Sequence, residues 1–372
     1  MILFRALLFN RWVGVHVGGT ETHIIGLANM LAKRGHEVSI LTSKGKRLNE
    51  YTSVKKEYVS KNWREPLYSR SLRLDKLLLV YGAFFCLKAF LSLFTLKLRG
   101  VKYDLVSVHC TLESFFMLCF RWLFRIPYVF IFEGYTPREA KVAKYADMQI
   151  AISQDIINKC YVNHGYKPIL IPVGVDLKRF DVDGSEIRQK YGSNGEKLVL
   201  TICRFDTRKD LPTLVSAANI VCREDPKVKF LIVGDGDERE KIEKQITELG
   251  LSDKVIIVRA APASPAYYRG CDVFVLPSIY EGFGIVFLEA MSAGLPIIST
   301  TTSAIPEVVG DAGILVPPKN PELLAKEISR VIYDKNLHRI LRDRGMARVK
   351  EYDWEKLIVR YEDAYESLIK LK

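Results

Sequence analysis

Short apolar runs alternate with helix-like patterns along most of the chain. In the second half, strands are predicted at residues 197–203, 228–233, 255–258, 273–277 and 296–300, and helices at 211–222, 238–249, 265–269, 284–293 and 321–334. The first half repeats the alternation less regularly, with strands predicted at 2–9, 37–41, 105–109, 128–132 and 149–152 and a helix at 22–34. Strands that alternate with helices at this spacing predict βαβ units and parallel sheets. The expected fold class is therefore α/β, with doubly wound sheets.

The length of the chain indicates two domains. Its 372 residues are more than one core comfortably holds. Residues 169–183 contain a proline and a glycine and have no helical pattern, so they are predicted to link the domains. Doubly wound domains bind ligands at the carboxyl ends of their strands. We therefore expect a ligand-binding cleft between the two domains.

The cysteines and the N-terminal residues bear on where the protein works. Seven cysteines are scattered in apolar runs without a CxxC pair, which indicates buried free thiols in a reducing compartment. The N-terminal sequence MILFRALLFN has an arginine in its middle and no small-residue cleavage site, so a first strand is predicted rather than a signal peptide. Both observations predict a cytoplasmic protein.

The positive charge is confined to the first half. The net charge is +12, and residues 1–170 contain 25 Lys and Arg against 12 Asp and Glu, whereas residues 171–372 contain 30 against 31. A basic half indicates an acidic partner, such as a phosphorylated substrate, an anionic lipid or a nucleic acid. Because no nucleic-acid-binding module is present, we expect no nucleic-acid partner.

Residues 72–98 are apolar and flanked by basic residues. Lys88 divides the segment into pieces too short for a transmembrane helix, which needs about 18 apolar residues. The flanking cations suit an interfacial helix on an anionic membrane: Arg70, Arg73, Lys76, Lys97, Arg99 and Lys102. The alternative is a pair of core helices with a basic outer face. The first interpretation predicts peripheral attachment at the inner face of the membrane, with Phe84, Phe85, Leu87, Phe90 and Leu91 inserted, whereas the second buries these side chains.

Residues 277–289, PSIYEGFGIVFLE, are the most informative stretch. Glu281 precedes a glycine turn, and Glu289 lies eight residues later, or about 12 Å along a helix. A helix that begins directly after a glycine turn exposes backbone N–H groups and a positive dipole end, which favour an anion. Taken alone, the two glutamates would be solvated helix residues. The preceding strand and the glycine turn favour a binding site.

Other candidate residues follow predicted strands. Arg204 and Lys209 follow the first strand of the second half, where cations can neutralise a diphosphate, although a solvated surface pair is the alternative. His109 and Glu133 end two strands of the first half. A lone histidine at a strand end is more often structural than catalytic, and the alternative for Glu133 is to cap a turn. Two Asp-x-Asp triplets, at Asp181 and at Asp235, lack the context of a metal site, so no metal is expected.

Glycines also open the first helix. Gly18 and Gly19 follow the first strand and permit a close backbone approach to a ligand, and Glu21 lies in the first turn after them. The pattern is not GxGxxG, and no acidic residue about 20 positions later is placed for a dinucleotide ribose. A dehydrogenase is therefore disfavoured.

Three motifs together resemble the retaining family 4 glycosyltransferases, also called group 1. They are the E-x7-E spacing with EGFG inside it, the segment GGTETHIIGLANMLAKRGHEVSILT, and the R-x4-K pattern at Arg204 and Lys209. The resemblance covers nearly the whole chain and implies the GT-B architecture, in which two Rossmann-like domains face each other across a cleft. Residues 1–172, completed by a helix over 355–372, would bind the acceptor, and residues 173–354 would bind the nucleotide-sugar.

The resemblance also implies an activity and a role for each candidate residue. A sugar would pass from a UDP- or GDP-linked donor to an acceptor hydroxyl with retention, without a tightly bound cofactor. The implied catalytic residues are His109, Arg204, Lys209 and Glu281. The implied donor-binding residues are Gly18, Gly19, Gly234, Asp235, Val258, Phe283, Gly284, Ile285 and Glu289. The implied acceptor-binding residues are Glu21 and Glu133.

Two departures from the family pattern affect these roles. Asp210 stands where the family usually has glycine, so Arg208 could replace Lys209 as the phosphate contact. Glu133 stands where histidine or aspartate is expected, on the acceptor side. We further expect Arg204 and Lys209 to face a wet cleft, so that their removal leaves the fold intact.

Alternative functions remain open at this point. The chain could be a catalytically silent nucleotide-sugar-binding scaffold, although the presence of Arg204, Lys209, Glu281 and Glu289 argues against it. A phosphorylase-type enzyme would need a lysine that holds pyridoxal phosphate, for which no context is found. The acceptor is expected to be a lipid-linked or envelope-glycan precursor, with a soluble acceptor as the alternative.

Overall fold

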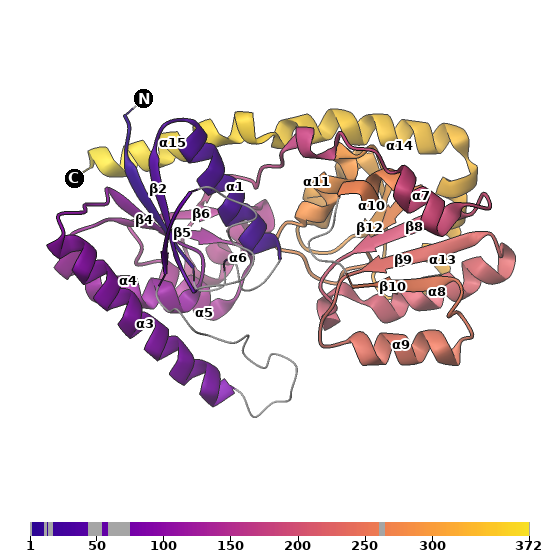
Figure 1. Ribbon diagram of the computed structural model, residues 1–372, viewed down its shortest axis with the longest axis horizontal. Coiled ribbons are helices and arrows are strands. Elements are labelled where there is room, and N and C mark those ends of the chain that lie inside the picture. The colour runs from indigo at the N-terminus through magenta and orange to yellow at the C-terminus, as the bar shows by residue number, and fades with distance from the viewer. Residues whose placement is uncertain are drawn as a thin grey trace. The chain divides into compact units, whose positions relative to one another are not determined.

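The computed structural model describes residues 2–10, 13, 18–43, 54–58, 75–259 and 265–371, and it divides into two compact units (Figure 1). Unit 1 comprises Met1–Gly174 with Trp354–Lys372, and unit 2 comprises Val175–Asp353. The C-terminal helix, drawn in yellow, therefore belongs to the same unit as the N-terminal half of the sequence.

The described part of unit 1 is built on seven parallel strands in the order β3-β2-β1-β4-β5-β6-β7. Their bounds are β1 Arg5–Phe9, β2 Glu37–Thr42, β3 Lys55–Tyr58, β4 Leu105–Val108, β5 Tyr128–Phe132, β6 Met148–Ala151 and β7 Ile169–Leu170. Every residue of β4 and β5 is buried, as expected for strands covered on both faces. The strand order reverses between β1 and β4, so the carboxyl ends of these strands are where a ligand is expected.

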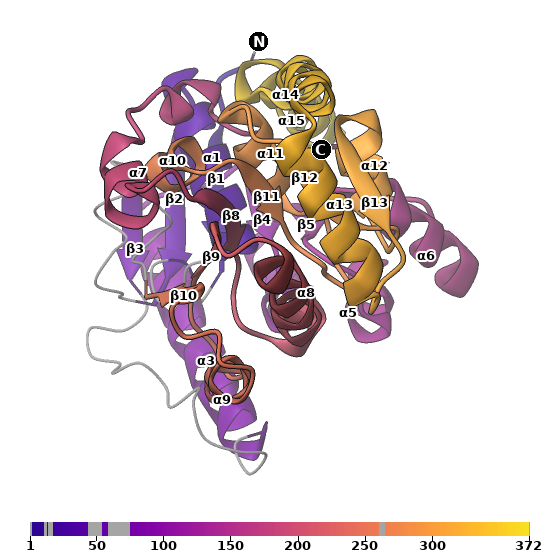
Figure 2. The same cartoon turned by 90° about the vertical axis from the view of Figure 1, so that its right-hand side faces the viewer.

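Helices cover both faces of this sheet (Figure 2). They are α1 Gly19–Lys33, α3 Asp75–Leu98, α4 Thr111–Phe124, α5 Pro137–Ala143, α6 Gln154–His164 and α15 Trp354–Lys370. α15 packs on α1, and its first residue, Trp354, fills a slot beside Gly26 and Gly174. A Cβ atom at either glycine would overlap the indole ring, so both positions require glycine for steric reasons.

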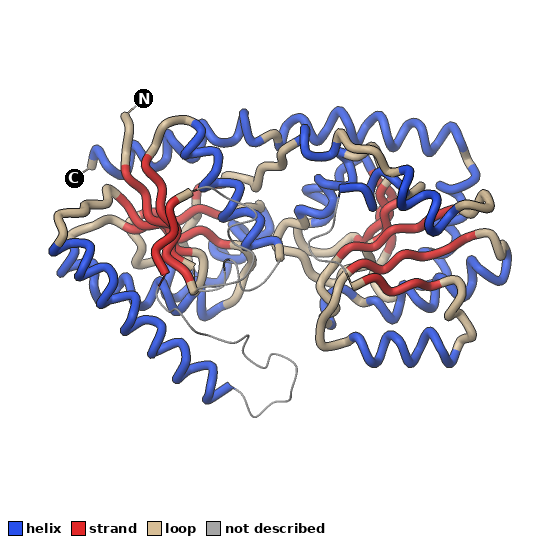
Figure 3. The backbone as a smooth tube through the Cα atoms, viewed as in Figure 1, coloured by secondary structure: helices blue, strands red, loops and turns tan. Residues whose placement is uncertain are grey.

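Unit 2 has the same construction, with six parallel strands among its described residues in the order β10-β9-β8-β11-β12-β13 (Figure 3). Their bounds are β8 Lys197–Ile202, β9 Val228–Val233, β10 Val255–Val258, β11 Val273–Val275, β12 Ile297–Thr300 and β13 Gly313–Val316. The order reverses between β8 and β11, which places the segments that follow these two strands at the expected ligand site of this unit.

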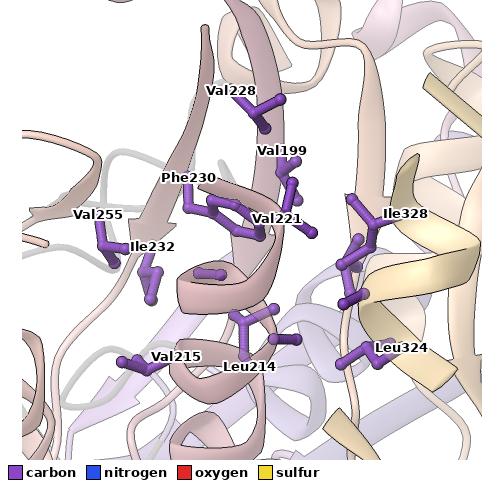
Figure 4. Packing of buried hydrophobic residues seen from close by; sticks show 14 of the residues in the cluster. Val199, Leu214, Val215, Val221, Val228, Phe230, Ile232, Val255, Leu324 and Ile328 are labelled. Atoms are coloured by element: carbon purple, nitrogen blue, oxygen red, sulfur yellow. The ribbon is translucent and has the colours of Figure 1, made fainter. Parts of the chain in front are cut away.

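The helices of unit 2 bury apolar faces on both sides of its sheet. The α-helices are α7 Ser185–Gly192, α8 Leu211–Glu224, α9 Arg239–Glu248, α10 Pro265–Gly270, α11 Ile285–Ser292, α12 Ile305–Val309, α13 Pro321–Tyr333 and α14 Lys335–Arg348. Short 3-10 turns lie at Leu177–Phe180, Thr207–Lys209, Gly310–Ala312 and Val349–Tyr352. Leu214 and Val221 of α8 and Phe230 of β9 belong to one continuous cluster of buried side chains (Figure 4).

Several sequence-based expectations change in detail. The predicted linker over residues 169–183 begins with β7, which belongs to the first sheet, and β3 and β13 were not predicted. None of the seven cysteines is in a disulfide, but Cys119 is exposed rather than buried.

The apolar segment at residues 72–98 matches neither prediction completely. Its described residues, Asp75–Leu98, form one helix, α3, which buries Phe85 and exposes Phe84, Leu87 and Leu91. Arg70 and Arg73 lie outside the described residues. Within the described part of the chain, no helix is long and apolar enough to cross a membrane.

Candidate functional site

Lys209 and Glu281 form an ion pair at the strand ends of unit 2. Lys209 Nζ donates to Glu281 Oε1 at 2.6 Å, and Ser278 Oγ donates to the same oxygen at 2.8 Å. The side chains of Lys209 and Glu281 are only 15% and 10% exposed. The expectation that Lys209 faces a wet cleft is therefore wrong for its side chain, because the ammonium lies against a mostly buried carboxylate.

Asp206 holds the other two cations of this segment. Its carboxylate accepts hydrogen bonds from Arg204 at 3.0 and 3.1 Å and from Arg208 at 2.8 and 3.1 Å. Although burial opposes it, these bonds and the charges of Arg208 and Arg204 lower the pKa of Asp206 to about 2. The Arg204 and Arg208 side chains are 57% and 48% exposed, so both guanidinium groups remain open to a ligand.

The structure separates Arg208 from Lys209 and explains Asp210. Arg208 pairs with Asp206, whereas Lys209 pairs with Glu281, so the two cations are not equivalent. Asp210 has a φ of +48°, in the left-handed region that favours glycine and that aspartate tolerates better than most residues. The aspartate thus adopts the backbone conformation for which glycine is the usual choice.

The turn before α11 presents backbone rather than side chains. Gly284 has a φ of +93° and precedes the first helical residue, and a Cβ atom there would lie 2.5 Å from the Phe287 ring. Phe283 and Ile285 are buried, and Phe283 packs on Tyr352 with ring centroids 5.7 Å apart. Of the predicted donor-binding residues here, Phe283 and Ile285 can therefore offer a ligand mainly their backbone groups.

Gly234, Asp235 and Val258 lie together at the ends of β9 and β10. Gly234 N donates to Val258 O at 3.0 Å, and a Cβ atom at Gly234 would overlap the backbone of Cys203. Its φ of +151° also requires glycine. Asp235 is half exposed and pairs with Arg239 and Arg259, at 3.4 and 3.2 Å. The glycine thus serves close packing of the strand ends, and the aspartate is already paired with cations.

Glu289 lies on α11 and bonds to a buried tyrosine. Tyr268 Oη donates to Glu289 Oε2 at 2.6 Å. Burial raises the pKa of Glu289, opposed by the Tyr268 hydrogen bond and the charge of Arg179. The carboxylate is thus held in one orientation on unit 2.

In unit 1, Glu133 accepts hydrogen bonds from two histidines. His109 and Glu133 follow β4 and β5, and His23 lies on α1. His23 Nδ1 and His109 Nδ1 lie 2.7 and 2.8 Å from the same oxygen, Glu133 Oε1. The far ring nitrogens are also bonded, from His23 to Tyr361 Oη at 2.9 Å and from His109 to Ser107 Oγ at 3.2 Å. Both histidine side chains are fully buried, and Glu133 is 10% exposed.

The three groups stabilise one another electrostatically. Burial alone would raise the pKa of Glu133, but the charge of His23 and hydrogen bonds from both histidines lower it to about 2. Burial lowers the pKa of His109, against the opposing effect of Glu133. Glu133 is therefore an ionised carboxylate at neutral pH, and it is the member of the cluster with some exposure.

Among the described residues, His23, His109 and Glu133 are close enough together to hold a metal ion. Their ligand atoms lie within 4.8 Å of one another. The shared Glu133 oxygen already accepts both Nδ1 atoms at hydrogen-bond distance, so the cluster is satisfied by its own hydrogen bonds. The expectation of no metal stays a prediction.

Gly18, Gly19 and Glu21 lie at the start of α1. Gly18 precedes the helix in an extended conformation, and a Cβ atom there would lie 2.9 Å from Glu21 Oε2. Gly19 is the first helical residue and is exposed. The backbone of Gly18 therefore lies close to the Glu21 carboxylate, and a larger residue at position 18 would collide with it.

Sequence reasoning missed several residues that complete these sites. His23 lies in the quoted GGTETH motif but received no role, and Tyr268 lies in the short helix before β11. Tyr361 is contributed by α15 and touches a residue 338 positions away in the chain. The GGTETH motif could have indicated His23, whereas no local pattern indicates Tyr361.

Comparison with known proteins covers both units. Residues 183–348 match the family model of glycosyl transferases group 1, and residues 17–179 match that of glycosyltransferase family 4. An uncharacterized glycosyltransferase of Methanocaldococcus jannaschii is 27% identical over 92% of this chain and 92% of its own length. O-antigen chain mannosyltransferase B of Escherichia coli is 30% identical over 49% of each chain. The structure of HepE from Anabaena in complex with UDP and glucose matches with a TM-score of 0.80 and 21% identity, over 98% of this chain and 100% of that one. The predicted fold class, α/β with two Rossmann-like domains, is confirmed.

Proposed function

Because the chain belongs to the group 1 and family 4 glycosyltransferases, which have the GT-B fold, we propose that it transfers a sugar from a nucleoside diphosphate sugar to an acceptor hydroxyl with retention. The observation that carries the proposal is the Lys209–Glu281 pair at the strand ends of unit 2, followed by the glycine turn before α11. The match to a structure that contains UDP and glucose supports a nucleotide-sugar as the donor.

Arg204 and Lys209 neutralise the donor diphosphate in this proposal. Charge develops on the leaving diphosphate as the bond to the sugar breaks, so fixed cations accelerate the step without reorganising. Glu281, whose bonded oxygen is also fixed by Ser278, holds Lys209 in place, and Asp206 holds Arg204. Backbone N–H groups at the start of α11 add to this stabilisation.

Glu289 binds the ribose of the donor. A carboxylate that already accepts one bond from Tyr268 still has lone pairs for ribose hydroxyls. The remaining donor contacts are assigned to the backbone around Gly18, Gly19, Gly234 and Phe283–Ile285, and to Asp235 and Val258. The donor is a sugar linked to UDP or GDP.

Glu133 binds the acceptor hydroxyl in unit 1, and Glu21 contributes to the same function. Since the Glu133 carboxylate stays ionised, it can accept a hydrogen bond from an acceptor hydroxyl. Its one bonded oxygen is fixed by His23 and His109. His109 is fully buried with both ring nitrogens bonded, so we assign it a positioning role through Glu133 rather than direct contact with sugar.

We also propose a lipid-linked or envelope-glycan acceptor and docking on the inner face of the membrane. The exposed apolar side chains of α3 lie in the unit that carries the excess of Lys and Arg. The name of the O-antigen mannosyltransferase, a relative over half of the chain, supports an envelope glycan.

A donor screen tests the proposed reaction. The full chain is heated with UDP-, GDP- and ADP-linked sugars in turn, and transfer or hydrolysis of each is followed. A donor at about 100 times its dissociation constant should stabilise the protein by about 2.7 kcal/mol, or roughly 5–11 °C for a domain of 150–250 residues. Glu289→Ala is the control, in which this shift should fall by about half or more. If no sugar nucleotide shifts the melting temperature or is consumed, the proposal is wrong.

A further inference from the structure

Helices α3 and α4 of unit 1 enclose an apolar groove of about 320 Å³. Leu87 and Phe90 line it from α3, and Leu112, Phe115 and Phe116 line it from α4, with a cysteine from each helix completing the walls. Leu87 and Phe115 are 56% and 55% exposed, so the mouth of the groove is open to solvent. A ligand with many polar groups would find no partner on these side chains, which indicates an apolar ligand.

The groove continues into an exposed apolar face of α3. Phe84, Leu87, Leu91, Phe94 and Leu98 recur every three or four residues, so they share one side of the helix. They are 39–73% exposed, whereas Phe85, Ala89, Leu93 and Leu96 on the other side are buried. An apolar face of this kind on a protein surface marks an interaction site.

Cations lie beside this face and near its C-terminal end. Lys88 Nζ lies 4.6 Å from the centroid of the Phe84 ring, and Lys97 Nζ donates to the backbone oxygen of Leu123 at 2.8 Å. Arg99, Lys102 and Arg125 are exposed near the end of α3 and of α4. Apolar side chains beside a group of cations complement a hydrocarbon chain that carries an anionic head group.

We propose that the groove binds one hydrocarbon chain of a phosphate-bearing lipid acceptor. This rests on the proposed lipid-linked acceptor and names the part of it that unit 1 holds. A cavity of about 150 Å³ accommodates one benzene molecule, so a groove about twice as large accommodates about a dozen carbon atoms. The remainder of a longer chain lies along Leu91 and Phe94 on the exposed face of α3.

Dansyl-undecanoic acid tests the groove in solution, without vesicles or sugar donor. Its fluorescence should rise when it binds the full chain, and octyl, decyl and dodecyl phosphate should displace it. Each methylene that enters the groove should tighten binding about fourfold, which corresponds to about 0.8 kcal/mol, until the groove is full. Leu87→Trp fills the groove and should weaken binding at least tenfold. Leu98→Trp makes the same change on the same helix outside the groove and should leave affinity within twofold.

Several outcomes would overturn the proposal. These are no probe binding by the wild type, equal effects of Leu87→Trp and Leu98→Trp, or affinity that falls as protein concentration rises, which would show a second copy of the chain in the groove. If Leu87→Trp does not fold, Phe115→Asp places a charge on the opposite wall and should abolish binding. Because the assay contains no sugar donor, its result is independent of whether the donor screen succeeds.

Discussion

Replacing Lys209 by methionine should cost the protein stability as well as turnover. The substitution leaves the Glu281 carboxylate, whose side chain is 10% exposed, with only the Ser278 hydroxyl on the bonded oxygen. Removing one partner of a buried ion pair costs about 3–5 kcal/mol, and the slight exposure of this pair places it near 3 kcal/mol. For a domain of 150–250 residues, that corresponds to a fall of about 6–12 °C in melting temperature.

A second substitution separates the two effects. Glu281→Gln in the Lys209→Met background removes the unpaired charge, so the double variant should recover most of the lost stability. Its turnover should stay about 10²–10³-fold below wild type, by analogy with the loss of one oxyanion donor. Arg204→Ala is the matched control: its side chain is 57% exposed, so stability should change by less than about 0.5 kcal/mol while turnover falls by a similar factor.

Calorimetry measures the stability of wild type, Lys209→Met, the double variant and Arg204→Ala. Transfer assays with the donor identified in the screen measure their turnover. The reasoning is refuted if Lys209→Met melts with the wild type, or if the double variant is no more stable than the single one. Either result would show that water solvates Glu281 well enough to replace its partner.

Three further predictions concern other groups. Glu289→Ala should weaken nucleoside diphosphate and nucleotide-sugar alike by about 1.5–3 kcal/mol in titration calorimetry, and unchanged diphosphate affinity excludes the ribose contact. The pKa of Glu133 lies near 2 rather than 4.5, so its carboxylate contributes stability above pH 4.5 that is lost as the pH falls toward 2. Urea unfolding should show a difference of about 3 kcal/mol between wild type and Glu133→Gln at neutral pH that shrinks over this interval, and a constant difference contradicts it. Wild type should co-sediment with anionic vesicles at low salt, less so as salt rises, and Leu91→Asp with Leu98→Asp should not; a folded wild type that stays in the supernatant rules out docking.

Much of the fold followed from apolar periodicity because its strands are buried on both faces. The runs at 197–203 and 228–233 contain the β8 and β9 strands, and the family resemblance inferred from the EGFG motif is confirmed. The missed strands are short. β7 has two residues, and β13 has four and begins with a glycine, so both apolar runs are too short to distinguish a strand from a loop.

The candidate site was predictable only where its residues are near in sequence to a motif. The cations after β8 were recognised from their spacing, but the burial of Lys209 depends on Glu281, 72 residues later, and was predicted wrongly. The histidine cluster depends on α1, β4, β5 and α15 meeting at one point. Contacts of that kind arise from packing and leave no periodic trace in the chain.

The slot for Trp354 has a consequence for biosynthesis. Unit 2 is one continuous segment, so it can fold as soon as it leaves the ribosome, whereas unit 1 must wait until Trp354–Lys372 has been made. Until then the nascent protein leaves the slot beside Gly26 and Gly174 empty and the apolar face of α1 uncovered. A premature stop shortly after residue 353 would therefore spare the later half and leave the first-made half unfinished, as a substrate for chaperones and proteases.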